Sequence, residues 1–345
     1  MKGKCYIQGM AAISPQPTFE ENCFSSPISF STTNLLPCLE PDYKPFIPAN
    51  SLRRMSRVLK MGLAASLKCI ADSGIKVSGP IVTGTGKGSL QDTEKFLKEI
   101  VTYKETALNP TPFIQSTYNS VNGLIALQQK CTAYNNTFVH RGFSFENALL
   151  DSMMLLQEGE DHVLTGAFEE ITREHFYIKS RIGFWKEEQI DSRELLSHHS
   201  PGSVAGEGAA FFMLTNQPTE KSYASITGLK LLYKPATEKL LSALQTFAPA
   251  VDAVITGRNG DSRFDHFYDT VEKYFGNTPQ IPFKQLCGEY DTASAFGMWL
   301  GAHLLRAQEL PQAWIGQPIA KPVNRLLLYN HFYGEQHVLI MLERV

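Results

Sequence analysis

An α/β fold with at least one partly parallel sheet is predicted by three features of the sequence. Strand-like and helix-like segments alternate along most of the 345 residues. The chain is 43% hydrophobic, and it is long enough for two ordinary domains or one large α/β domain. The second half shows an order of elements similar to that of the first, without a residue-level repeat. We therefore expect two similar α/β halves joined near residues 201–208.

The elements of the first half follow from apolar spacing and from the positions of glycine and proline. Residues 4–13 are predicted to form a strand, and residues 14–50, with seven prolines, an irregular surface excursion. Helical spacing predicts a helix at 51–73, with Gly74 as its C-cap. Further helices are expected at 112–130, at 144–156 and from Ser89 onward, where Asp92 makes a weak capping box, and further strands at 81–84, 137–140 and 162–166.

The second half is predicted from the same signals. Strands are expected at 209–214, 226–233, 253–256, 325–329 and 337–342, and helices at 237–247, 263–274 and 292–308.

A glycine cluster, Gly84-Thr85-Gly86-Lys87-Gly88, follows the strand at 81–84. It lacks the spacing of a phosphate-binding loop, and Ser89 stands where a GxGxxG motif needs its third glycine. A tight strand-to-helix turn is the favoured interpretation, with nucleotide binding as the minor alternative.

Composition excludes several classes of protein. The 32 basic and 34 acidic residues balance without a long run of either sign, so no nucleic-acid partner is expected. No apolar run reaches membrane-spanning length, and the first residues do not read as a signal peptide, so no membrane partner is expected. Six cysteines without CxxC spacing, and His198-His199 without a third ligand, predict no metal site. Buried thiols of a cytoplasmic protein are expected instead.

Five segments, in order along nearly the whole chain, resemble the β-ketoacyl synthases, the condensing enzymes of the thiolase fold. They are YIQGMAAISP at 6–15, VTGTGKG at 82–88, LQEGEDHVLTGAFE at 156–169, GEGAA at 206–210 and NHFYGEQH at 330–337. The resemblance implies a thiolase-like fold of two α/β halves in a five-layered α-β-α-β-α arrangement. We place the N-terminal half at residues 1–205 and the C-terminal half at 206–345, as one compact unit.

The resemblance also implies a cysteine nucleophile and two histidines, and none of the three matches. The nucleophile position falls at Arg141, or one residue to either side at His140 or Gly142. Thr256 stands in place of the first histidine and Glu289 in place of the second, whereas the family's Lys284 is retained. The nearest thiol, Cys131, precedes the strand rather than following it and is expected to be a packed residue.

Loss of all three catalytic positions on a retained scaffold resembles the chain-length factors. These are catalytically silent relatives that pair with an active synthase and shape the tunnel holding the growing acyl chain. The resemblance implies a heterodimer with an active ketosynthase, or a homodimer, with residues 133–145 at the interface. It implies an acyl chain on acyl carrier protein as second partner, a fatty-acid, polyketide or aryl-polyene pathway, and no cofactor. The alternative is a thiolase-fold acyl-thioester transferase or hydrolase with a non-cysteine mechanism.

One structural hypothesis follows from the substituted positions. An arginine at the start of a buried helix is disfavoured unless a carboxylate meets it. We therefore expect Arg141 and Glu289, with Thr256, to form a polar plug. The alternative is that Arg141 points into solvent or a subunit interface.

Overall fold

The computed structural model has the predicted α/β architecture and describes residues 4–75, 79–319 and 321–345. Within those residues ten strands form one mixed sheet, in two sets of five. The first set runs β1 (Cys5–Ile13), β7 (Gly208–Thr215), β5 (His162–Glu169), β3 (Ile81–Gly84) and β4 (Asn135–Phe138). The second runs β8 (Ala224–Tyr233), β12 (Gln336–Glu343), β11 (Arg325–Phe332), β9 (Ala253–Thr256) and β10 (Gln280–Pro282).

The two sets repeat one topology, which confirms the prediction of two similar halves. In each set the first two pairings, β1–β7–β5 and β8–β12–β11, are antiparallel. The next two, β5–β3–β4 and β11–β9–β10, are parallel. A short antiparallel pairing of Cys5–Ile7 with 224–226 joins the two sets.

The position of β7 bears on the boundary between the halves. This strand pairs along its length with β1 and β5 of the first set. A boundary at 205/206 would assign β7 to the second half, although both of its partner strands belong to the first set. We therefore propose that the halves meet in the connection from β7 to β8, at residues 216–223.

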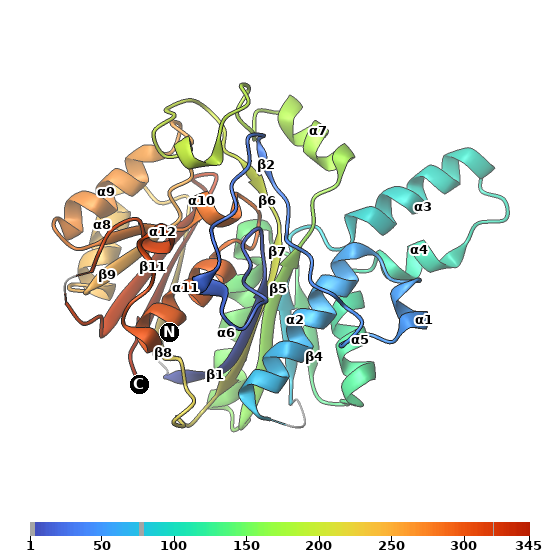
Figure 1. Cartoon of the computed structure of the whole chain (residues 1–345), viewed down its shortest axis with the longest axis horizontal. Coiled ribbons are helices and arrows are strands. Elements are labelled where there is room, and N and C mark those ends of the chain that lie inside the picture. The colour runs from blue at the N-terminus through green and yellow to red at the C-terminus, as the bar shows by residue number, and fades with distance from the viewer. Residues whose placement is uncertain (1–3, 76–78, 320) are drawn as a thin grey trace.

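Helices complete the five layers, as Figure 1 shows. The central layer is α6 (Ser144–Gln157), which packs on β3 and β5, and α11 (Ser294–Ala307), which packs on β11. One outer layer is α2 (Arg57–Ser73) and α5 (Ser120–Gln129), and the other is α8 (Thr237–Phe247) and α9 (Asp265–Phe275). Outside these layers lie the long helix α3 (Leu90–Tyr103) and α7 (Arg173–Arg181). The shorter elements are α1 (Ala49–Leu52), α4 (Pro110–Gln115), α10 (Lys284–Cys287), α12 (Gln312–Ile315), β2 (Leu35–Leu36) and β6 (Ala205–Gly206).

Two predicted helices differ from the structure. The helix expected at 51–73 begins only at Arg57, although it ends as predicted at Gly74, whose φ of 72° suits glycine. The helix expected at 112–130 is interrupted between α4 and α5. There the hydroxyls of Thr117 and Ser120 both donate to the carbonyl of Ile114, and such side-chain bonds compete with helix propagation.

Helix α7 was missed because its sequence, REHFYIKSR, is charged and has no wholly buried residue. Thr172 caps it by accepting a hydrogen bond from the backbone of His175. The strand predicted at 137–140 lies two residues earlier, as β4 at the end of the sheet.

Candidate functional site

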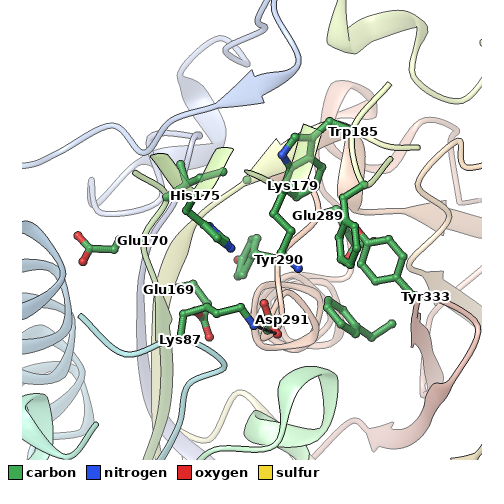
Figure 2. Close-up of a pocket in the computed structure, with 14 residues that line it drawn as sticks. Lys87, Glu169, Glu170, His175, Lys179, Trp185, Glu289, Tyr290, Asp291 and Tyr333 are labelled. Atoms are coloured by element: carbon green, nitrogen blue, oxygen red, sulfur yellow. Dashed lines mark hydrogen bonds and ion pairs between the residues drawn. The ribbon is translucent and has the colours of Figure 1, made fainter. Parts of the chain in front are cut away.

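A pocket of about 340 Å³, part of which opens to solvent, lies between segments of the two halves (Figure 2). The first half contributes the turn after β3, the end of β5, and α7 with the loop after it. The second half contributes the loop after α10 and the end of β11. The residues that line the pocket are Lys87, Glu169, Glu170, Ile171, His175, Lys179, Phe184, Trp185, Gly206, Glu289, Tyr290, Asp291, Phe332 and Tyr333.

Glu289 is held in the pocket wall by the segment that carries the GEGA motif. Its backbone N–H donates to Val204 at 2.8 Å, and its carbonyl accepts from Gly206 at 3.1 Å. Gly206 lies so close to the segment at residues 287–288 of the same chain that a Cβ there would be 1.9 Å from the carbonyl oxygen of Cys287. A glycine is therefore required for this segment to position residue 289.

The carboxylate of Glu289 forms a fully buried ion pair. Lys284 Nζ lies 2.5 Å from its Oε2, and Asn259 Nδ2 donates to the same oxygen at 2.6 Å. Burial raises the pKa of Glu289, and the neighbouring Lys284 opposes that rise. Because its charge is already neutralised, Glu289 is poorly suited to act as a general base.

A second ion pair and a protonated carboxyl lie across the pocket. Lys87 Nζ is 3.0 Å from Asp291 Oδ1. Glu169 accepts hydrogen bonds from the backbone of Gly86 and, at 3.2 Å, from the hydroxyl of Thr85. Burial, followed by the charge of Asp291, raises the pKa of Glu169 to about 8, so this carboxyl is mostly protonated at neutral pH.

These contacts decide between the two interpretations of the glycine cluster. The N–H of Gly86 is taken by Glu169, and that of Gly88 donates to the Thr85 hydroxyl at 2.9 Å. The chain's own side chains thus occupy donors that a phosphate would need, as expected for a structural turn.

Two side chains of α7, one helical turn apart, face the pocket from above in Figure 2. Burial lowers the pKa of His175 to about 4 and that of Lys179 to about 8. The ammonium of Lys179 lies 3.5 Å from the ring centroid of Phe184, whose ring is 4.0 Å from that of Tyr333. His175 is therefore neutral at physiological pH, while Lys179 is mainly charged.

The predicted pair of Arg141 and Glu289 is wrong, because the two side chains have other partners. Arg141 Nη1 lies 3.0 Å from Glu335, and its side chain is 50% exposed. Because the guanidinium of Arg141 stays in contact with solvent, it does not incur the desolvation cost of a buried charge. The counter-ion of Glu289 is Lys284. The structure thus favours the solvent-facing alternative for Arg141.

The backbone around Arg141 is nevertheless unusual. Its φ is 53°, and it begins the short 3-10 turn that leads into α6. Gln336 fixes this turn by accepting from the backbone N–H of Gly142 at 2.9 Å and donating to the carbonyl of His140 at 3.1 Å. A strand-to-helix turn is therefore present at residues 140–142, where the resemblance predicts the nucleophile position, and which of the three residues takes that position stays a prediction.

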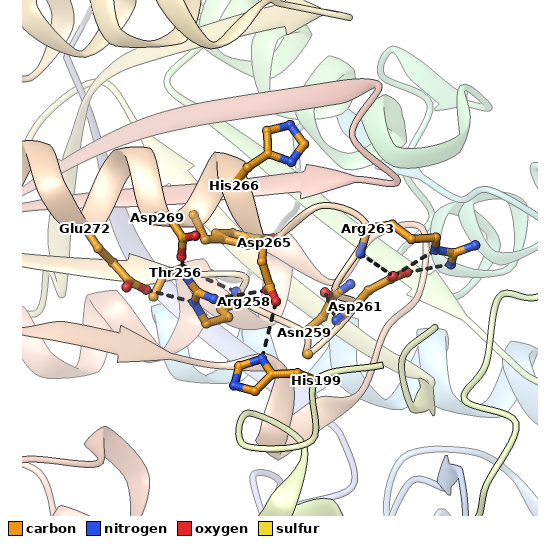
Figure 3. Close-up of polar contacts among 12 residues, drawn as sticks. His199, Thr256, Arg258, Asn259, Asp261, Arg263, Asp265, His266, Asp269 and Glu272 are labelled. Atoms are coloured by element: carbon orange, nitrogen blue, oxygen red, sulfur yellow. Dashed lines mark hydrogen bonds and ion pairs between the residues drawn. The ribbon is translucent and has the colours of Figure 1, made fainter. Parts of the chain in front are cut away.

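Thr256 ends β9 outside the pocket lining, at the start of a loop that ion pairs hold in place (Figure 3). Its hydroxyl accepts from the backbone of Arg258 at 3.2 Å. The guanidinium of Arg258 bonds three carboxylates of α9, namely Asp265, Asp269 and Glu272. The third part of the plug hypothesis, participation of Thr256, therefore has no support in these contacts.

None of the lining residues of the described pocket is a cysteine. Five cysteines are buried and Cys131 is half-buried. Burial raises the pKa of Cys5 to about 12 and that of Cys23 to about 11, and it raises the pKa of Cys38, Cys69 and Cys287 as well. These five thiols are in the wrong protonation state for a nucleophile.

Among the residues that the structure describes, no three histidine, cysteine or acidic side chains are grouped to hold a metal ion. His199 is exposed and lies 3.6 Å from Asp265. No helix within the described ranges is long and apolar enough to cross a membrane.

Sequence reasoning missed most of the charged residues of the pocket. Lys87 lies in the glycine cluster that the sequence singled out, but Asp291, His175 and Lys179 belong to no recognised motif. The spacing of His175 and Lys179, four residues apart, places them on one helix face once α7 is recognised.

Comparison with known proteins gives one family match over part of the chain and one fold over the whole of it. Residues 34–181 match the β-ketoacyl synthase N-terminal domain. A β-ketoacyl synthase from Burkholderia phymatum STM815 superposes with a TM-score of 0.80 at 16% identity, covering 100% of both chains. The ishigamide ketosynthase/chain length factor gives 0.76 at 14%, again over 100% of both chains. A ketosynthase in complex with its chain length factor from Xenorhabdus doucetiae gives 0.74 at 17%, covering 100% of this chain and 98% of that one. No curated protein matches by sequence.

Proposed function

We propose that this chain, whose residues 34–181 match the β-ketoacyl synthase N-terminal domain and which has the thiolase-like fold of ketosynthases, is a non-catalytic, chain-length-factor-like subunit. In this proposal it pairs with an active ketosynthase and shapes the tunnel for acyl chains carried by acyl carrier protein. The pathway would be of the fatty-acid, polyketide or aryl-polyene type.

The observation that carries the proposal is the state of Glu289. In the register of the resemblance this residue takes the place of a catalytic histidine, and its carboxylate is locked between Lys284 and Asn259. Lys284 and Asn259 both bind Oε2 of this carboxylate, so Glu289 is held as the partner in a buried ion pair and is not free to exchange protons with a substrate as a catalytic histidine does.

Two further observations support the proposal. The elbow before α6 presents the half-exposed Arg141, paired with Glu335, where the resemblance places a thiolate. The pocket wall holds no thiol among the described residues, and five of the six cysteines have a raised pKa. Thioester exchange onto this chain therefore has no nucleophile of the family's kind.

The edge of the sheet is consistent with the proposed dimer. Within the described ranges strand β4 pairs only with β3 and ends the ten-stranded order, so the other edge of its backbone has no strand partner there. Residues 133–145, which include β4 and the elbow, remain the interface that we propose, formed with a ketosynthase or with a second copy.

Co-expression tests this function. The tagged chain is produced together with any ketosynthase that is encoded beside its gene, and the two are expected to co-purify as one dimer by size-exclusion chromatography. A matched pair of variants refines the test: Thr137→Pro on the edge strand should abolish pairing, whereas Thr246→Pro near the end of α8 leaves the edge intact. A stable monomer that binds no ketosynthase would contradict the proposal.

The same preparation separates the alternative of a non-cysteine acyl-thioester enzyme. The purified chain alone is expected to leave malonyl and acyl carrier thioesters intact. Turnover that survives Cys131→Ala and Cys287→Ala and disappears in Glu289→Gln would establish that alternative.

A further inference from the structure

The side chain of Lys186 ends in a cage of oxygen atoms. Lys186 is 3% exposed, and its Nζ lies 2.8 Å from the carbonyl oxygen of His198, 3.1 Å from that of Ser200 and 2.8 Å from that of Gly260. The hydroxyl of Ser200 is the fourth oxygen, at 3.0 Å. A carbonyl oxygen can only accept, so these three carbonyls need the three N–H groups of an ammonium, whereas a neutral amine has two.

The charge of this ammonium is stabilised by uncharged oxygens. All four contacts of Nζ go to carbonyl or hydroxyl groups. Asp261 is the acid whose charge acts most strongly on Lys186, but its two carboxylate oxygens bind Arg263 at 2.8 and 2.6 Å. A buried charge without a counter-ion is costly unless other groups replace its hydration, as carbonyl oxygens do for K⁺ in channels. The cage is therefore a cation site in which the cation is part of the chain.

The cage joins the two halves of the molecule. His198 and Ser200 lie in the segment between α7 and β6, residues 182–204, which we call the wall loop, whereas Gly260 follows β9 in the second half. The two segments are in close contact, because a Cβ on Gly260 would lie 2.1 Å from the carbonyl oxygen of Leu195. The φ of 69° at Gly260 also suits glycine. The ammonium of Lys186 thus binds both segments at one point.

The wall loop also carries one wall of the pocket. Phe184 and Trp185, directly before Lys186, line the pocket, and the indole N–H of Trp185 is buried without a partner among the described residues. The backbone N–H of Lys186 donates to the carbonyl of Ser203 at 2.9 Å, which holds the two ends of the loop together. The position of Trp185 therefore depends on how the next residue is anchored.

We propose that the ammonium of Lys186 is a built-in ligand of this cage, which fastens the wall loop to the second half and holds the pocket wall in place. It follows that the cage binds a free primary ammonium ion once the side chain is shortened. Lys186, His198 and Ser200 also line an open surface groove, which gives such an ion access from solvent. Lys186 lies outside the positions that the family resemblance marks, and the inference holds whether or not the chain pairs with a ketosynthase.

Chemical rescue tests the proposal. The atoms that Lys186→Ala removes are those of n-propylammonium, so this ion is the matched probe. Backbone hydrogen exchange of the wall loop, followed by mass spectrometry, should be at least about tenfold faster in Lys186→Ala than in the unaltered chain. Propylammonium chloride should return it to within about twofold of the unaltered chain. Tetramethylammonium chloride at the same concentration has no N–H group and should leave the exchange fast.

The indole N–H signal of Trp185 in ¹⁵N nuclear magnetic resonance reports on the pocket wall. Assigned with Trp185→Phe, it should shift in Lys186→Ala and return when propylammonium is added. Trp299 and Trp314, buried in the core near α11 and α12, are internal controls whose signals should not move.

Two variants are controls for the rescue. Lys186→Met keeps the length of the side chain without its charge and fills the space, so its wall loop should exchange fast with or without propylammonium. Lys239→Ala removes an exposed ammonium from α8 and should leave the exchange within about twofold of the unaltered chain.

Three results would overturn the proposal: unaltered exchange in Lys186→Ala, no slowing of that variant by propylammonium, or equal slowing by tetramethylammonium or in Lys186→Met. If Lys186→Ala does not fold without the ion, refolding in each salt becomes the measurement. Propylammonium alone should then restore the folded chain, and failure to do so contradicts the cage as a cation site.

Discussion

Removing Lys284 is the most informative single change in the structure, because its ammonium neutralises a carboxylate that has almost no access to water. The two side chains are 0% and 2% exposed, and Nζ lies 2.5 Å from Glu289 Oε2. In Lys284→Met the carboxylate keeps one donor, Asn259, and loses its counter-charge. Breaking a buried pair in this way costs about 3–5 kcal/mol of the free energy of unfolding. We expect a loss of this size at pH 8.

The pH dependence of Lys284→Met has a definite sign. Burial already raises the pKa of Glu289, and loss of Lys284, its largest opposing influence, raises it further. The folded variant then binds a proton that the unfolded chain releases, so stability falls as pH rises from the unfolded to the folded pKa. The free energy of unfolding that Lys284→Met loses relative to the unaltered chain should therefore be smaller at pH 5 than at pH 8.

A double variant supplies the control. Lys284→Met with Glu289→Leu replaces both charges by apolar groups of similar size and should recover most of the loss. Urea unfolding followed by tryptophan fluorescence, at pH 5 and pH 8, measures all three proteins. The reasoning is refuted if Lys284→Met lies within about 1 kcal/mol of the unaltered chain at pH 8, or if the double variant is as unstable as the single one.

Three further changes test other parts of the structure. Arg141→Gly removes a half-exposed ion pair and relieves a positive φ, so the free energy of unfolding should change by less than about 1 kcal/mol or rise; a large loss in urea unfolding would contradict this. Glu207→Gln weakens a buried carboxylate that binds Arg57 and two backbone N–H groups, and should cost roughly 3–5 kcal/mol, whereas the exposed Glu220→Gln should cost almost nothing in the same assay. Burial lowers the pKa of His337 to about 4, so the unfolded chain binds the extra proton and stability is lost as pH falls from about 6.5 through 4. His337→Phe should flatten that loss, which midpoints measured from pH 7 to pH 4 will show, at the cost of the hydrogen bond from Tyr329.

Predictions from the sequence succeeded where one local signal decided the outcome. The apolar stripe and Gly74 predicted the end of α2, and the second half of the chain gave α8 and β9 with their observed bounds. The fold class followed from alternation, because consecutive strands and helices of this kind can bury their apolar faces in few ways. Failures arose where side chains acted on the backbone, as at Thr117 and Ser120.

The candidate site was harder to predict because its chemistry depends on pairing. The sequence named Glu289 and Lys284 but joined Glu289 to Arg141, since the partner of a buried charge is set by packing and not by spacing. Lys179 lies in a helix whose charged sequence reads as solvent-facing, and only the fold turns one of its faces toward the pocket.

The pocket also shows why a balanced composition says little about a site. A net charge of −2 over 345 residues says little about this pocket, because Asp291 and Glu289 are each paired with a lysine and burial raises the pKa of Glu169 and of Glu170. Lys179 is then left without a counter-ion, beside donors that have no partner. Under the proposed function the absence of the family's cysteine and histidines removes catalysis, and binding of a small molecule in the pocket is a separate property that can be measured on the same protein.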